Sequence, residues 1–167
     1  MSPAFKFILI FGASYLLMSG LYQLVIWAAA PGPDIFTILV AQILPHFISG
    51  IELHSFPSKS GIQIWNSEGA LVNIMEGCNG MAVWITLLSF TLAFTGKPKT
   101  YLWFLPLSFL LLQIGNILRL ITLIQLKIQK PDLFEIFHTY LFPAILYAFA
   151  FGLMVWWVKM IQSINKK

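Results

Sequence analysis

The sequence predicts an all-α integral membrane protein with about four transmembrane helices, a surface-lying helix and a small β-hairpin on the outer face. Of the 167 residues, 59% are hydrophobic and only 10% are charged, whereas roughly 25% are charged in soluble domains. Apolar runs long enough to span a bilayer, which takes about 20 residues, recur along the chain. We therefore expect one membrane-embedded domain over residues 1–167.

The first expected span covers residues 5–29. A secretory signal peptide is the alternative, because Lys6 precedes the run and the alanines at 28–30 resemble a cleavage site. The apolar part of a signal peptide has only about 7–15 residues, and Pro31 directly follows the alanines. The length of the run therefore favours a retained anchor.

An extracytoplasmic insert is expected over residues 31–77. It opens with Pro31-Gly32-Pro33-Asp34, a turn that also suits the start of a helix. The apolar segment 35–51 follows, interrupted by Gln42, Pro45, His46 and Gly50. We expect a helix that lies on or dips into the membrane surface; a further full span is the alternative.

A small β-hairpin is expected after this helix. Residues 62–66 and 70–74 alternate apolar and polar side chains around the loop Ser67-Glu68-Gly69. Alternation around a short glycine-containing loop is typical of a hairpin. Three further spans follow, at residues 81–94, 101–126 and 136–161.

The lysines predict the orientation. With four spans and a cytoplasmic N-terminus, six lysines lie inside, namely Lys6, Lys97, Lys99, Lys159, Lys166 and Lys167. Three lie outside, namely Lys59, Lys127 and Lys130. All six acids also lie outside, namely Asp34, Glu52, Glu68, Glu76, Asp132 and Glu135. This bias obeys the positive-inside rule, and an extra span at 35–51 would break it. We expect a multi-pass protein of the cytoplasmic (inner) membrane with both termini in the cytoplasm.

Composition excludes several function classes. The net charge is +4, but the lysines are scattered and form no basic stripe, so we expect no nucleic-acid partner. The chain has one cysteine, which excludes an internal disulfide. A single thiol is also a poor metal site. We expect neither a metal nor a cofactor.

The single cysteine lies in an unusual sequence, Glu76-Gly77-Cys78-Asn79-Gly80. Glycines on both sides allow tight turns and close approach of another chain. Asn79 can cap a helix that begins at Gly80 or Met81. Cys78 would then lie at a helix N-terminus, where the dipole favours a thiolate. A nearby ionised Glu76 would oppose this effect.

Two other rare residues are expected at the same depth as Cys78. Arg119 is the only arginine, and it lies about 27 Å along a span that begins near residue 101. An intramembrane charge is costly and functional by default. Gln113 and Asn116 precede it at three-residue spacing, which suggests a polar stripe facing a cavity. His138 opens the last span at the outer face; His46 and His54 are rival candidates.

A thiol, a base-capable histidine and a fixed cation describe a thiol acyl-transfer site. Cys78 would attack a carbonyl, and His138 would move protons to and from the leaving and incoming groups. Arg119 would stabilise or orient the developing oxyanion.

The same residues resemble the exosortase/archaeosortase family of membrane cysteine transpeptidases. The resemblance rests on Glu76-Gly77-Cys78-Asn79-Gly80, on Asn116-Ile117-Leu118-Arg119 and on His138. Many members read Cys-Ser-Gly at the first motif and carry more N-terminal spans, so this chain resembles a short branch. The resemblance implies that Cys78 is the nucleophile, Arg119 the oxyanion or substrate stabiliser, and His138 the acid/base.

The resemblance also implies the partners. The substrates would be exported proteins with a C-terminal sorting signal made of a short motif, an apolar helix and a basic tail, delivered through the lipid bilayer and passed to a cell-surface acceptor. Plain proteolysis with water as acceptor is one alternative. A non-catalytic assembly subunit of an export or exopolysaccharide system, with Arg119 paired to a partner's acid, is another.

Overall fold

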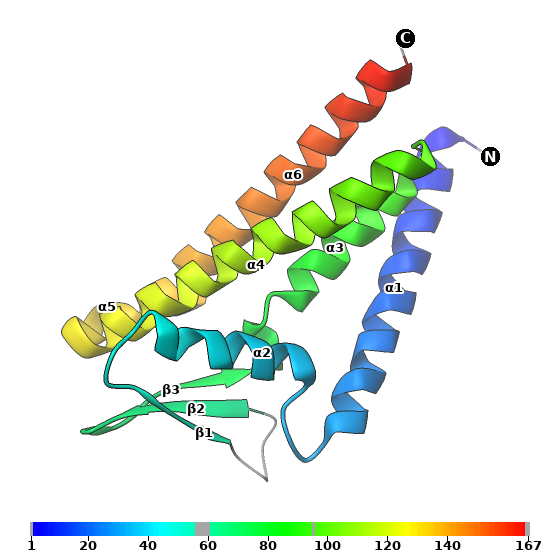
Figure 1. Cartoon of the computed structure of the whole chain (residues 1–167). Coiled ribbons are helices and arrows are strands. Elements are labelled where there is room, and N and C mark those ends of the chain that lie inside the picture. Colours follow the sequence, from blue (N-terminus) through cyan, green and yellow to red (C-terminus); the bar gives the residue numbers. More distant parts are fainter. Residues whose placement is uncertain (1, 56–60, 95, 166–167) are drawn as a thin grey trace.

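The computed structural model describes residues 2–55, 61–94 and 96–165. A helical bundle occupies one end and a small sheet the other (Figure 1). Three of the lysines used to predict orientation, Lys59, Lys166 and Lys167, lie outside the described residues.

Within the described residues, three helical segments are long and apolar enough to cross a membrane. They are α1 (Pro3–Ala29), α4 (Pro98–Gln129) and a continuous run over Pro131–Ser163. That run comprises α5 (Pro131–Ile136), a π-helical turn η3 (Phe137–Leu141) and α6 (Phe142–Asn165). The remaining expected span is α3 (Met81–Ala93), which has 13 residues. At 1.5 Å per residue it measures about 20 Å, short of a hydrocarbon core of about 30 Å.

The bundle core lies between α3, α4 and α6. Its buried side chains are Val83, Leu87, Phe104, Leu112, Leu146, Ala150, Leu153, Trp157 and Ile161. The turn from α3 to α4 packs against the end of α6, because a Cβ at Gly96 would lie only 2.7 Å from Ile161 Cδ1. Tyr101 closes this turn: its hydroxyl donates to Phe94 O (2.5 Å) and accepts from Gly96 N (2.9 Å).

The first helix, α1, attaches to the bundle through α3. Its Phe7 ring contacts the rings of Phe90 and Phe94 edge-on, with centroids 5.7 and 5.0 Å away. None of its residues is buried. An apolar helix of this length with no buried residue is compatible with a membrane span.

The segment expected to lie on the membrane surface is shorter than predicted. It forms α2 (Ile35–Ile43), which Asp34 caps, and a 3₁₀ turn η1 (Leu44–His46) with Pro45 inside it. Nine α-helical residues measure about 14 Å, too short for a span. The alternative of a full span at 35–51 is therefore excluded, and α2 packs over the sheet instead (Figure 1).

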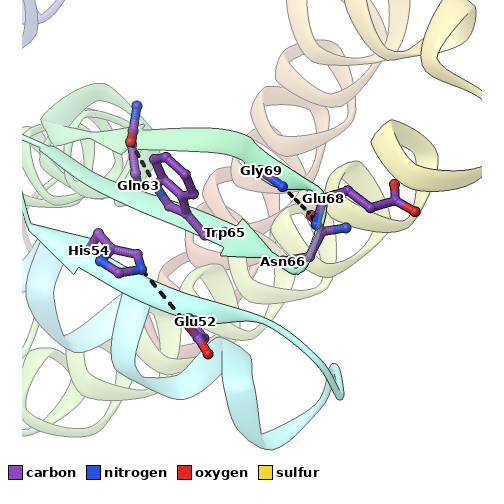
Figure 2. Close-up of polar contacts among 7 residues, drawn as sticks. All are labelled: Glu52, His54, Gln63, Trp65, Asn66, Glu68 and Gly69. Atoms are coloured by element: carbon purple, nitrogen blue, oxygen red, sulfur yellow. Dashed lines mark hydrogen bonds and ion pairs between the residues drawn. The ribbon is translucent and has the colours of Figure 1, made fainter.

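The predicted hairpin is confirmed as β2 (Gly61–Asn66) and β3 (Gly69–Met75). A third strand, β1 (Glu52–Ser55), was not predicted and extends it to an antiparallel sheet of order β1-β2-β3. Asn66 Oδ1 accepts from the backbone N–H groups of Glu68 and Gly69 and closes the turn (Figure 2). A second core joins α2 and the sheet to the end of α4, through Val40, Ala41, Leu44, Ile62, Ile64, Ile74, Leu120 and Ile124.

The ends of the elements divide between the two ends of the molecule. The start of α1, the end of α6 and the junction of α3 with α4 lie at one end, while α2, α5 and the sheet lie at the other (Figure 1). Among the described lysines, those at 6, 97, 99 and 159 therefore lie at the end of the fold opposite Lys127 and Lys130, as the lysine pattern predicts.

Candidate functional site

Cys78 lies in a tight turn between the sheet and the bundle. A short 3₁₀ turn, η2 (Glu76–Cys78), follows β3, and Gly80 is the residue before α3. Gly80 has φ +77°, and a Cβ there would lie 3.4 Å from Asn116 Cγ. The backbone conformation favours glycine, whereas the distance to Asn116 is an ordinary van der Waals contact that leaves room for a Cβ. Gly77 lacks this constraint, since its φ is not positive, and its Cβ position is open.

Helix α4 holds the backbone of this turn. Asn116 Nδ2 donates to Cys78 O at 2.8 Å, and Gln113 Nε2 donates to Asn79 O at 3.0 Å. Asn116 is fully buried. These two amides of the expected polar stripe therefore fix successive carbonyls next to the thiol.

The side chain of Asn79 holds the same turn from the opposite direction. Asn79 lies one residue before the N-cap of α3, which is Gly80, and its Oδ1 accepts from the N–H of Met81 at 3.0 Å. Asn79 Nδ2 faces three acceptors, namely Tyr22 Oη, Asp34 Oδ2 at 3.2 Å and Thr37 Oγ1 at 3.1 Å. We call Tyr22, Asp34, Thr37 and Asn79 the Asn79 network. The sequence indicated only Asn79; the turn at Asp34 was the one local signal for the others.

His138 lies in the π turn η3. Pro143 has no N–H to donate to Thr139 O, so a regular helix is interrupted there. The N–H of Phe142 instead reaches Phe137 O, five residues back. The His138 ring stacks on Phe134 with centroids 5.5 Å apart and planes 6° apart. Single π turns inside helices occur frequently at functional sites.

The structure brings Cys78 and His138 to the wall of one cavity of about 310 Å³. Strand β3, helix α4 and the α5–η3 segment supply the rest of the lining, which includes Leu71, Val72, Asn73, Ile74, Leu120, Leu123, Phe134 and Glu135. Glu135 is a carboxylate that the sequence analysis did not select. Its Oε1 accepts from Thr139 Oγ1 at 3.1 Å. Its position three residues before His138 on a helix was a usable signal.

Arg119 lines a different cavity, of about 240 Å³, between α4 and α6. Six residues at 100° each leave Arg119 about 120° around the helix from Gln113, so the stripe leaves the face that holds the Cys78 turn. Arg119 Nε is buried and has no hydrogen-bond acceptor among the described residues. The structure therefore separates Arg119 from the cavity that Cys78 and His138 share.

The remaining candidates lie as follows. Glu76 Oε1 is buried, with no donor among the described residues. His46 is exposed in η1. His54 is exposed on β1, where Nε2 lies 3.6 Å from Glu52 Oε2 and the ring contacts Trp65 (Figure 2). Neither histidine lines the cavity of Cys78, which supports the higher rank given to His138.

Across the described part of the chain, no three His, Cys, Asp or Glu side chains gather in a way that could hold a metal ion. Comparison of the chain with protein-family models, curated proteins and solved structures finds no match. The resemblance to the exosortase/archaeosortase family therefore stays a hypothesis based on the motifs around Cys78, Arg119 and His138.

Proposed function

We propose that this protein is a membrane-embedded cysteine transpeptidase or peptidase in which Cys78 is the nucleophile and His138 the acid/base. One observation carries the proposal: residues from two distant segments, a thiol and an imidazole, line the same cavity. The turn that presents the thiol is held by side chains of α4 and by Asp34, the N-cap of α2. Supporting hydrogen bonds of this kind hold a catalytic side chain in its productive position.

The reaction has two steps. The Cys78 thiolate attacks a peptide carbonyl, a C–S bond forms and the C–N bond breaks, and His138 gives a proton to the leaving amine. The imidazole then takes a proton from the incoming nucleophile, which breaks the thioester and releases Cys78. An amine of a surface acceptor gives transpeptidation, and water gives hydrolysis.

Arg119 flanks this site and does not line it. We assign it to charge stabilisation on the substrate side, because a guanidinium is a strong donor of hydrogen bonds to anions and Arg119 lines a cavity between α4 and α6. The same unpaired Nε favours the second candidate function, a non-catalytic assembly subunit in which Arg119 pairs with an acid of a partner.

The proposal places the protein in the cytoplasmic membrane, with the termini and the α3–α4 turn in the cytoplasm and the Cys78 cavity toward the outside. Helix α3 would be the second of four crossings. Because α3 measures only about 20 Å, the Cys78 turn would lie below the outer membrane surface. Irregular backbone at that depth is tolerated where protein covers it, as the Asn79 network does here. The substrates would be exported proteins with a C-terminal apolar helix and basic tail.

The test compares cells that express the wild type, Cys78→Ala or Cys78→Ser. Exported proteins ending in an apolar helix and a basic tail should be shortened only by the wild type, as measured by mass spectrometry of membrane fractions. A mass increment on the new C-terminus distinguishes transfer from hydrolysis. Processing that persists in Cys78→Ala would contradict catalysis and leave the assembly-subunit function.

His138 is tested separately with a matched control. His138→Ala should lower processing and accumulate a hydroxylamine-sensitive adduct on Cys78, because resolution of the thioester needs a base. His46→Ala removes an exposed histidine that does not line the cavity and should process normally. Equal activity of the two variants would remove His138 from the mechanism.

A further inference from the structure

The Asn79 amide has a defined orientation. Its oxygen accepts from Met81 N, so its nitrogen must face Asp34 and Thr37. A carboxamide is suited to this place because it offers an acceptor on one side and donors on the other. Asn79, Asp34 and Thr37 are all fully buried.

The Asp34 carboxylate is occupied at both oxygens. Oδ1 accepts from Phe36 N at 2.9 Å and Thr37 N at 3.3 Å. Oδ2 accepts from Thr37 Oγ1 at 2.5 Å and from Asn79 Nδ2 at 3.2 Å. No lysine or arginine among the described residues forms an ion pair with it. A buried carboxylate held by four donors at the start of α2 is a rigid anchor, because each donor fixes its direction.

This anchor acts on the residue next to the thiol. On one side, α4 holds the carbonyls of residues 78 and 79. On the other, Asp34 holds the side chain of residue 79, and Tyr22 ties it to α1. The Cys78 turn is therefore clamped between α4 and the start of α2.

We propose that Asp34 is a positioning residue for Cys78 and acts through Asn79, with Thr37 and Tyr22 completing the clamp. The catalytic part of this inference rests on the proposed function. Displacement of a reacting group by about 1 Å can lower a rate about 10²-fold. A released turn would also expose the thiol, which is half-buried against the core beneath α2.

The test exchanges the two partners in the full-length protein, in detergent. Asp34→Asn alone places one amide nitrogen against another, and Asn79→Asp alone places two carboxylates together. The double variant Asp34→Asn/Asn79→Asp restores a donor facing an acceptor. N-ethylmaleimide is the probe, and because Cys78 is the only cysteine its alkylation rate reports the turn directly.

Each single variant should be alkylated about tenfold faster or more, the change expected when one charge-assisted hydrogen bond is lost. The double variant should return to within about threefold of the wild type, as coupled neighbours do. Thr37→Val should accelerate alkylation as well. Its matched control is Thr91→Val, which changes a buried threonine bonded to Leu87 O on α3 and should leave the rate unchanged.

Wild-type alkylation rates in both single variants, with only a lower melting temperature, would overturn the inference and make the network a stability element. Faster alkylation without recovery in the double variant would overturn the action through Asn79. Because alkylation needs no substrate, failure of the transpeptidase proposal would show separately, as absence of processing by a wild type whose thiol is correctly held.

Discussion

The two glycines beside Cys78 differ in what the backbone requires of them. Gly80 has φ +77°, a conformation that favours glycine, whereas the φ of Gly77 is not positive. Both were selected from the sequence for the same reason, proximity to the thiol. The distinction rests on the backbone conformation of the turn, which the residue types around Cys78 do not reveal.

Gly80→Ala should destabilise the protein by about 1–2 kcal/mol, the cost of a Cβ in a left-handed conformation, and should abolish processing as the turn shifts. Gly77→Ala should fold like the wild type. Thermal unfolding in detergent measures both variants. Equal unfolding temperatures for the two would contradict the local geometry.

Arg119 shows what helical counting can and cannot give. Counting residues along α4 gives the distance of Arg119 along the helix, but the cavity that its side chain lines depends on which helices pack against α4.

If Arg119 stabilises negative charge on the substrate, Arg119→Lys should fold normally and lose about 10²–10³ in processing rate, as when an oxyanion donor is removed. Processing at the wild-type rate, with an associated protein lost on purification, would favour the assembly-subunit function.

At the level of elements, the π turn before Pro143 sets the direction of His138. Pro143→Ala would permit a regular helix, and closing the wide turn would rotate His138 by about 100° relative to α6. Removing an interior proline can relieve up to about 3 kcal/mol. We therefore expect equal or higher thermal stability together with a loss of processing.

Pro106→Ala is the control for this change. Pro106 also lies inside a helix, α4, but does not line the Cys78 cavity. Pro106→Ala should therefore process substrate at the wild-type rate. Retained activity in Pro143→Ala would mean that the π turn does not position His138.

The elements with strong local signals were predicted, and those decided by packing were not. The β2–β3 hairpin followed from alternation around Ser67-Glu68-Gly69, and α1 and α4 from their long apolar runs. Strand β1 has only four residues, too few to show a period. Helix α3 is short because the chain leaves the helical conformation at Phe94. The Tyr101 hydroxyl donates a hydrogen bond to the backbone carbonyl of Phe94.

At the scale of the whole molecule, the division of the elements predicts accessibility. In a Cys78→Ala background, single cysteines at Glu68 and Lys130 should react with an impermeant maleimide in intact cells. A cysteine at Lys97 should react only after permeabilisation, because the α3–α4 turn lies at the opposite end of the fold (Figure 1). Labelling of position 97 alone would reverse the orientation and direct the Cys78 cavity to the cytoplasm.

Site residues that stand out in the local sequence were predictable, whereas contacts between distant segments of the chain were not. Cys78 and His138 stand out as rare residues at the ends of apolar runs, and Asn79 by its place next to Cys78. Tyr22 is one aromatic among many in an apolar helix, and nothing local indicates that its hydroxyl meets Asn79. Such contacts arise from how α1 leans on α3, a property of the assembled bundle.

The hydrogen bond from Asn116 to Cys78 O joins residues 38 apart in the chain. At about 5–20 residues per second, a ribosome needs roughly 2–8 s to make that stretch. During this interval Cys78 has been synthesised, but the part of α4 that holds its turn has not. The newborn Cys78 turn therefore lacks the two hydrogen bonds from α4 during this interval, and its thiol should react with a maleimide faster than the thiol of the folded protein.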